Sequence, residues 1–249
     1  MFTESSLRKI KDFSTGDPII SLYLNTEPSR GNAETHRLRL RNMIKDISLK
    51  QDADAIEKYF NYSYDWSGRS VAVFSCAPAD FFHAIPLAVP VKDFIQIGSK
   101  AAVDQLEDLL QEFSNIGVIV VDKQGARLFH FHLGELVEQE GYLGDLVKHV
   151  KDGGASSAHG LRGGSLASGR TVRETIDRNQ REIAEAATKF LETKRVRRIL
   201  IGGTDENVSH FRNFMPKAMQ SLVVGSFTMA MTATTSEVLH KVLQTLQES

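Results

Sequence analysis

The part of the chain that could most readily carry out chemistry is the glycine- and serine-rich segment Gly144–Arg170. Six of the eighteen glycines of the chain fall between Gly153 and Gly169. Glycine lets a backbone pass close to a crowded partner, although ordering it costs conformational entropy. A connection of this length without its own periodicity is typically functional or disordered. We therefore expect a flexible functional loop here.

Basic residues gather in and after this segment. Between Asp145 and Arg198, twelve lysines and arginines outnumber seven acidic residues by five, whereas the whole chain has a formal net charge of −1. Lys and Arg contacts to phosphates supply most sequence-independent affinity for nucleic acids. A solvated loop beside a salt-bridged helix is the alternative that residue types leave open. The residues expected to contact the phosphates of such a partner are Lys148, Lys151, Arg162, Arg170 and Arg173.

The segment leads into a helix that we expect over residues 172–194. Thr171 and Glu174 have the spacing of a capping box, which sets the expected helix start at about Thr171. Apolar residues then recur along one stripe of the helix. Because the free amides and the dipole at a helix start favour an anion, this terminus is expected to support phosphate binding.

The first part of the chain, residues 1–98, is expected to form an N-terminal α/β domain of unassigned role. Its strands are expected over 18–25, 70–76 and 82–91, and its helices over 33–47 and 53–62. The basic residues on the first of these helices are interpreted as a solvated face: Arg37, Arg39, Arg41 and Lys45.

The second part, residues 99–249, is expected to contain a mixed sheet. The expected order is helix 99–113, strands 117–122, 126–133 and 135–142, helix 172–194, strand 198–202, helix 206–219, strand 222–229 and helix 235–247. Three antiparallel strands followed by alternating helices and strands give an α/β sheet of mixed direction. The order is that of a ribonuclease H-like layout.

Composition narrows the class of protein. With 41% hydrophobic and 24% charged residues, the chain is typical of soluble globular proteins, and the single Cys76 excludes an internal disulfide. The N-terminus lacks the apolar run of a signal peptide, and no stretch reaches the about 18 apolar residues of a membrane span. We expect a cytoplasmic protein that uses no membrane, metal or cofactor. The sequence does not define its oligomeric state.

Three other groups could carry chemistry. Asp122 ends a strand where a two-metal nuclease places a carboxylate, but Asp122–Gly125 also makes a good turn, which is the favoured interpretation. His130 and His132 share one face of a strand and could chelate a metal, although a polar strand face is the simpler interpretation. Ile201–Glu206 could hold a phosphate at a helix start, or form a turn capped by Thr204 or Asp205.

The residues from Arg162-Gly163-Gly164-Ser165 onward carry a resemblance to a known family. It rests on this tetrapeptide, on TVRETIDRNQREIAEAATKF, on RRILIGGTDENVSHFRNFMPKAMQSLVVGSF and on the upstream GVIVVDKQGARLFHFHLGEL. The chain resembles the middle domain of archaeal and eukaryotic peptide-chain release factors and of their relative Pelota, most closely the bacterial branch of that superfamily. The resemblance extends from Gly117 to Leu246.

In that family a Gly-Gly-Gln tripeptide at the loop tip enters the ribosomal peptidyl-transferase centre. The resemblance implies that the chain contacts the ribosome and tRNA. It also implies that Gly163, Gly164 and Ser165 stand at the catalytic position for hydrolysis of the ester between peptide and tRNA. Ser165 replaces the glutamine that positions the attacking water, and Ala167 occupies the place where bacterial relatives often carry a glutamine.

Several functions therefore stay open. Ser165, Ser168 or His159 could hydrogen-bond a water, but a serine is about two carbon–carbon bonds shorter than a glutamine and catalysis depends on close positioning. The alternatives to hydrolysis are a ribosome- or tRNA-binding protein that lost the active glutamine and a metal-dependent nuclease that uses Asp122. The family's stop-codon-reading domain has no recognisable counterpart in the chain, so the resemblance implies codon-independent action such as ribosome rescue.

Overall fold

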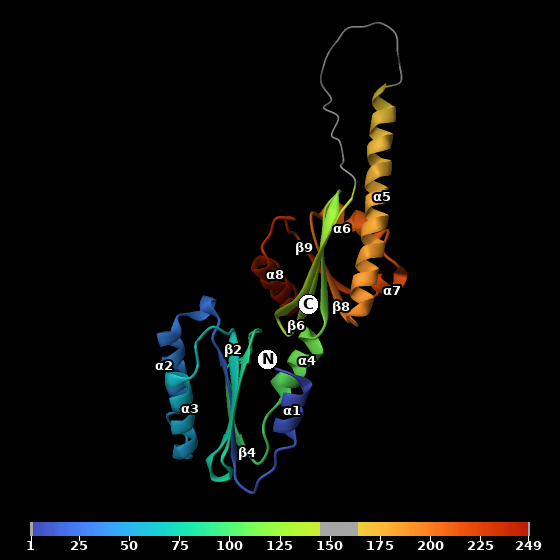
Figure 1. Ribbon diagram of the computed structural model, residues 1–249. Helices are drawn as coiled ribbons and strands as arrows, with labels where there is room; N and C mark the ends of the chain where they lie inside the picture. The colour runs from blue at the N-terminus through green and yellow to red at the C-terminus, as the bar shows by residue number, and fades with distance from the viewer. Residues whose placement is uncertain (1, 145–163, 249) are drawn as a thin grey trace. The chain divides into compact units, whose positions relative to one another are not determined.

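The computed structural model describes residues 2–144 and 164–248, with only the backbone described for residues 164–171. The chain divides into two compact units (Figure 1). Unit 1 consists of Met1–Ser114 and Leu133–Glu135, and unit 2 consists of Asn115–His132 and Leu136–Ser249. Each unit is built around its own β-sheet.

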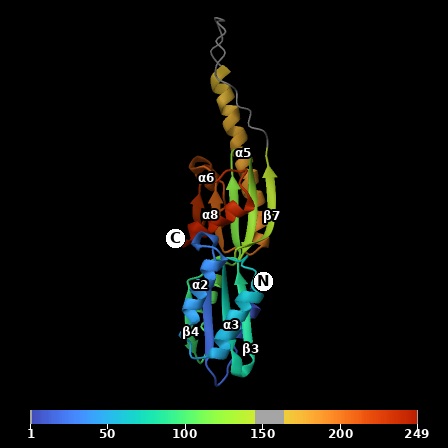
Figure 2. The same cartoon turned by 90° about the vertical axis from the view of Figure 1, so that its left-hand side faces the viewer.

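Unit 1 is a four-stranded antiparallel sheet with helices on both faces (Figure 1), and Figure 2 looks onto the face that α2 and α3 cover. Strands β1 and β2 lie in the centre of the order β3-β2-β1-β4 and are buried along their whole length. Helices α2 and α3 cover one face with Leu40, Ile44, Ile56 and Phe60. The elements are α1 (Glu4–Lys11), β1 (Ile19–Asn25), η1 (Pro28–Arg30), α2 (Ala33–Ile44), α3 (Lys50–Tyr62), β2 (Ser70–Cys76), η2 (Ala77–Ala79), β3 (Phe81–Leu87), β4 (Phe94–Gly98) and α4 (Asp104–Phe113).

Helix α2 does not present a uniformly solvated face. Arg39 donates from Nη1 to the Asp93 carboxylate at 2.9 Å, and the Arg37 guanidinium lies 5.1 Å from the centre of the Trp66 ring. The solvated-face interpretation was wrong for these two arginines, because each packs against a loop residue of unit 1. It holds for Arg41, which is exposed.

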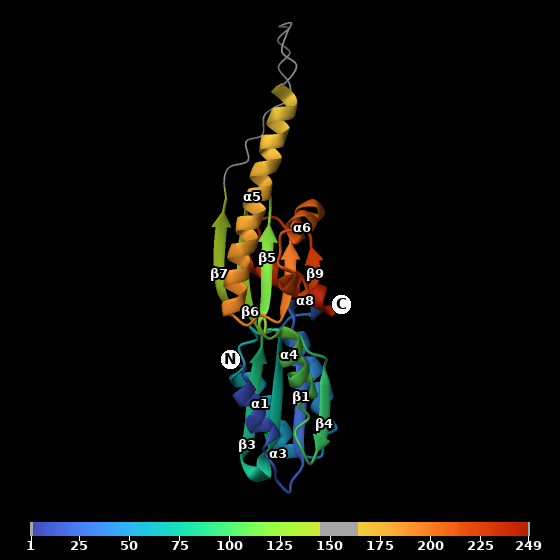
Figure 3. The ribbon, with the colours of Figure 1, turned by 90° about the vertical axis from the view of Figure 1, so that its right-hand side faces the viewer.

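Unit 2 contains a five-stranded mixed sheet in the order β7-β6-β5-β8-β9 (Figure 3). Strand β5 is antiparallel to β6 and parallel to β8, and β8 is parallel to β9. The predicted mixed α/β sheet with ribonuclease H-like strand order is confirmed. The elements are β5 (Ile116–Val121), β6 (Gly125–His132), β7 (Glu135–Leu143), α5 (Gly164–Thr193), β8 (Arg198–Gly202), α6 (Asp205–Arg212), α7 (Lys217–Gln220), β9 (Val223–Phe227) and α8 (Thr235–Gln247).

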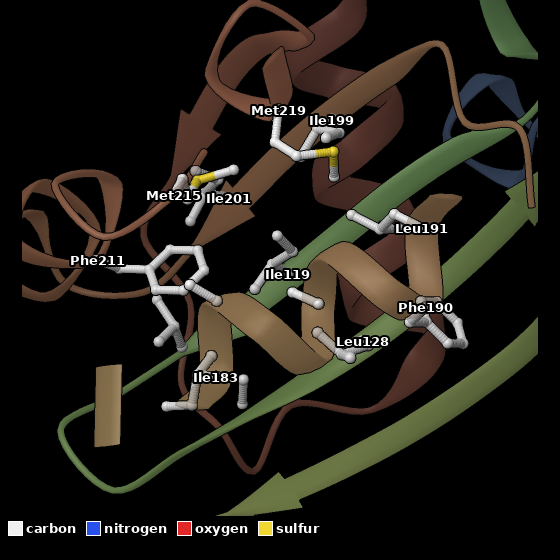
Figure 4. Close-up of a cluster of buried hydrophobic side chains, with 14 of the residues drawn as sticks. Ile119, Leu128, Ile183, Phe190, Leu191, Ile199, Ile201, Phe211, Met215 and Met219 are labelled. Carbon is white, nitrogen blue, oxygen red and sulfur yellow. The ribbon is translucent and has the colours of Figure 1, made fainter. Parts of the chain in front are cut away.

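The core of unit 2 lies between helix α5 and one face of the sheet (Figure 4). Ile183 and Leu191 of α5 pack with Ile119 of β5 and Leu128 of β6, and Phe211 of α6 closes the cluster. Full burial of a side chain of this size contributes about 1.5–3 kcal/mol relative to exposure. The apolar stripe seen in the sequence therefore packs α5 against the sheet.

No helix in the described part of the chain is both long enough and apolar enough to cross a membrane.

The division between the units falls after Ser114, whereas the sequence placed it near Gly98. Helix α4 was expected to open the second domain, but it packs in unit 1. Lys11 of α1 and Glu107 of α4 form an ion pair of 2.6 Å, and the Tyr23 hydroxyl donates to the Ala102 carbonyl at 2.7 Å. These contacts assign the helix to the first sheet.

Helix α5 begins at Gly164, seven positions before the expected cap at Thr171. Leu166, Ala167 and Arg170 are good helix formers, so the helix continues through them. Thr171 is thus an interior residue of the helix. The capping-box prediction was wrong, because a Thr-x-x-Glu pattern marks a helix start only where helix formers do not precede it.

Gly117 sets how closely α5 approaches the sheet. A Cβ at this position would lie 2.5 Å from Leu191 Cδ2 and 3.0 Å from Val196 Cγ1. Gly117→Ala is expected to lower the free energy of unfolding by about 1–3 kcal/mol, the usual effect of overpacking a core. Chemical denaturation measures this change. Gly141→Ala is the control, since nothing lies within 4 Å of its added Cβ, and equal effects of the two substitutions would contradict the packing role of Gly117.

Candidate functional site

The predicted site residues fall at the start of α5. Gly164 and Ser165 are its first two residues, and Arg170 and Arg173 follow on later turns. The side chain of Arg173 is exposed; of Gly164, Ser165 and Arg170 only the backbone is described. Lys148, Lys151, Arg162 and Gly163 lie outside the described residues. The structure thus brings four of the predicted residues onto one helix.

Two buried amide side chains hold α5 on the sheet. Asn179 donates from Nδ2 to the Lys123 carbonyl at 3.3 Å, and Gln180 donates from Nε2 to the Asp122 carbonyl at 2.7 Å. Both residues are almost completely buried. The bonds join the middle of α5 to the turn between β5 and β6, and Figure 1 shows that the N-terminal part of the helix extends beyond the sheet.

The chain leaves the sheet beside the same turn. The Gly144 amide donates to the Gln124 carbonyl at 2.7 Å. A Cβ on Gly144 would lie 2.6 Å from Asn179 Oδ1, so a larger residue would displace the Asn179 side chain that bonds to Lys123. Close packing therefore favours glycine at this position. The point at which the chain enters the segment 145–163 is fixed relative to α5.

Asp122 stabilises the turn between β5 and β6 that contacts α5 and Gly144. Its Oδ1 accepts from the Gln124 amide at 2.7 Å and from the Gly125 amide at 2.8 Å. The favoured turn interpretation is confirmed, since this carboxylate oxygen is occupied by backbone donors. Within the described residues, no group of three His, Cys, Asp or Glu side chains could hold a metal ion. The described structure gives no support to a two-metal centre at Asp122.

A groove of about 750 Å³ lies between α5, α6 and the β5–β6 turn. His210 Nε2 of α6 and Asp177 Oδ1 of α5 are 2.9 Å apart across it. Lys123 and Glu206 form an ion pair of 3.1 Å on its rim. We call this site the α5–α6 groove; it is lined by Lys123, Val172, Arg173, Ile176, Asp177, Gln180, Glu206, Asn207, Ser209, His210 and Asn213.

The groove was not predicted from the sequence, apart from Arg173. A signal for it was present in α5, where Gln180 occupies the apolar stripe between Ile176 and Ile183. A polar residue at a core position of an amphipathic helix requires a buried partner. The pairing of Asp177 with His210 could not be found in this way, because it joins two helices far apart in the sequence.

The strand-to-helix turn Gly202–Glu206 is a conventional helix start. Thr204 is the N-cap of α6, and its side chain accepts from the Asn207 amide. Gly203 has φ +154, a conformation that side-chain-bearing residues rarely adopt. Asp205 and Glu206 occupy the first turn and would repel a phosphate there. The capped-turn interpretation is confirmed.

His130 and His132 lie on the face of β6 that α5 covers, while Phe129 and Phe131 stack on the other face. His130 is 6% exposed, and its Nε2 lies 3.2 Å from Asn115 Oδ1. Its Nδ1 has no partner among the described residues. Burial, followed by the nearby His132 and Lys194, lowers the pKa of His130, although Glu138 opposes the shift. His130 is thus a buried neutral side chain that packs under α5.

The strand order of unit 2, together with the long helix α5 that packs on its sheet, defines a ribonuclease H-like α/β fold. The model of bacterial archaeo-eukaryotic release factor family 10 matches residues 102–247, and the chain belongs to this family. The predicted membership of the bacterial branch of the superfamily is confirmed. No curated protein matches the chain.

The chain is also similar to several solved structures. The crystal structure of archaeal translation termination factor aRF1 is 15% identical and aligns over 98% of this chain and 71% of its own, with a TM-score of 0.38. A structure described as an archaeal protein gives 14% identity, coverages of 98% and 72%, and the same TM-score, 0.38. The Thermoplasma acidophilum Pelota protein is 18% identical, with coverages of 70% and 47% and a TM-score of 0.30.

His130 should make the stability of unit 2 depend on pH. A histidine whose pKa is lowered below 6.5 by folding stabilises the folded state above that value, and the contribution is lost as the pH falls. The free energy of unfolding should therefore decrease between about pH 7 and about pH 5, and His130→Leu should reduce this decrease. Denaturation at the two pH values measures it, and an unchanged pH dependence in the variant would contradict the assignment.

Proposed function

We propose that this protein is a release-factor-like translation protein that rescues ribosomes by hydrolysing peptidyl-tRNA, without reading a codon. The observation that carries the proposal is the start of α5 at the Gly-Gly pair, on a ribonuclease H-like sheet matched by the release-factor family model. Family members place a Gly-Gly-Gln tripeptide at this point. The protein acts, on this account, in the cytoplasm, where ribosomes are found.

The start of helix α5 suits RNA as a binding partner. The first turn of a helix has backbone amides without intrahelical acceptors and carries the positive end of the dipole. Arg170 and Arg173 follow within three turns of the start of α5. Both features attract phosphate groups. They support contact with ribosomal RNA or tRNA, together with the sequence-predicted residues Lys148, Lys151 and Arg162.

The reaction would be attack of water on the ester carbon that joins the peptide to tRNA. The ester carbon–oxygen bond breaks, the peptide leaves as a carboxylic acid and the tRNA keeps its hydroxyl group. Two features of the sequence suit this chemistry. Gly163 and Gly164 leave room for close approach of the backbone, and the Ser165 hydroxyl can both donate to and accept from a water.

A second candidate function is binding without hydrolysis. The observation that favours it is Ser165 itself, which stands where the family has glutamine. Misplacement of a catalytic group by about 1 Å can lower a rate by about 100-fold. A protein of this kind would occupy the ribosome or tRNA and leave the ester intact.

Arg173 offers a test of RNA contact. Arg173→Glu is expected to weaken tRNA binding several-fold at low salt and to reduce the slope of log affinity against log salt by about 1, as for loss of one phosphate contact. Filter binding of tRNA over a salt series measures both quantities. Lys189→Glu is the matched control, since it makes the same charge change at an exposed position near the other end of α5. Equal losses in the two variants would contradict a local contact at Arg173.

Ser165 offers a test of the chemistry. Stalled ribosomes that carry a labelled nascent peptide should release it when the wild-type protein is added, and Ser165→Ala should abolish the release. Ser165→Gln should accelerate release by up to about 100-fold, because glutamine reaches further toward the reacting carbon. Release only by Ser165→Gln would favour the binding function. No release by any of the three proteins would contradict hydrolysis.

A further inference from the structure

Apart from Arg173, the residues of the α5–α6 groove have no role in the function proposed above, yet the groove has the features of a ligand site. Its volume of about 750 Å³ lies within the range of about 300–1,000 Å³ usual for small-molecule sites. Val172 and Ile176 supply apolar surface on the α5 side, and polar side chains of α6 face them. Such a mixture suits a flat ring system with a polar edge.

Amide side chains are the most specific feature of the groove. Asn207, which is half-buried, and Asn213, which is exposed, line the groove with amide side chains that a ligand can reach. Gln180 is 1% exposed, and its Oε1 has no partner among the described residues. A buried acceptor without a donor is costly, so a ligand that brings an N–H group would be stabilised there. Asparagine and glutamine amides match the donor and acceptor pairs on nucleobase edges.

The charged residues of the groove suit a phosphate group at the end nearer the start of α5. The two acidic residues are engaged, Asp177 with His210 at 2.9 Å and Glu206 with Lys123 at 3.1 Å. Arg173 lies one turn beyond Asp177 toward the start of α5, and its guanidinium is exposed. The Lys123 pair is also on the surface, where ion pairs are weak, so this lysine can exchange its carboxylate for a phosphate.

We propose that the α5–α6 groove binds a single nucleotide of an RNA strand. Amide side chains of Asn207, Asn213 and Gln180 contact the base edge, Val172 and Ile176 contact its face, and Arg173 contacts the phosphate. The proposal rests on the function proposed above for the source of the nucleotide, the RNA of the ribosome or tRNA. The site is separate from the Gly-Gly pair and takes no part in ester hydrolysis.

Equilibrium dialysis of the full chain with AMP, GMP, CMP and UMP tests the groove, with inorganic phosphate as a further ligand. At least one nucleotide should bind saturably and more tightly than phosphate. Asn207→Ala and Arg173→Ala should each weaken that binding by about tenfold, the usual effect of losing one good polar contact. Asn61→Ala, at an exposed position in unit 1, should bind as the wild type does. Circular dichroism of each variant verifies that the protein is folded.

Three results would overturn the proposal. The first is the absence of saturable binding of any nucleotide up to about 10 mM; the second is unchanged binding in both Asn207→Ala and Arg173→Ala. The third is failure of a single-stranded RNA oligomer to displace the bound nucleotide, which would show a site for free nucleotides only.

The two proposals can fail separately. Ribosome binding without nucleotide binding would overturn the groove assignment alone. Nucleotide binding without ribosome binding would overturn the proposed function and the RNA source, and would leave a nucleotide site in the groove.

Discussion

Two buried amides, Asn179 and Gln180, fix the position of helix α5, and the rest of the candidate site depends on them. Each donates to a backbone carbonyl of the turn between β5 and β6. A buried amide that loses its partner costs about 1–3 kcal/mol. Helix α5 therefore cannot slide along the sheet without breaking both bonds, and the apolar cluster beneath it adds a second constraint of the same kind. The direction in which residues 164–173 extend from unit 2 is set by these contacts.

The β5–β6 turn serves three purposes. The Asp122 carboxylate closes it, its carbonyl groups receive α5, and Lys123 forms one end of the α5–α6 groove. Gly144 passes against Asn179 beside it, so the point at which the chain enters the glycine-rich segment is fixed at this turn. A ribonuclease H-like sheet places this turn at the end of its first strand. In this protein, that position supports a helix and a groove, and the described residues assemble no metal site there.

The sequence was informative where periodicity and local chemistry determine structure. The strand order of unit 2 followed from the alternation of elements, and the turn at Asp122 and the cap at Thr204 followed from residue types. The start of α5 could not be read from the Thr171–Glu174 pattern, because helix formers before Thr171 extend the helix to Gly164. The assignment of α4 to unit 1 depends on the tertiary contacts of Lys11 and Tyr23, and such contacts leave no local signature. The α5–α6 groove escaped prediction for the same reason. The catalytic role assigned to Gly163, Gly164 and Ser165 rests on the family resemblance and stays a prediction.

The central claim, that this family member acts on the ribosome through the basic start of α5, is tested most directly by co-sedimentation with ribosomes over a salt series. The account predicts that the protein pellets with ribosomes at about 50 mM salt and that binding falls steeply by about 200 mM, because several phosphate contacts release counterions. Failure to pellet at the lowest salt, or binding that does not change with salt, would contradict the claim.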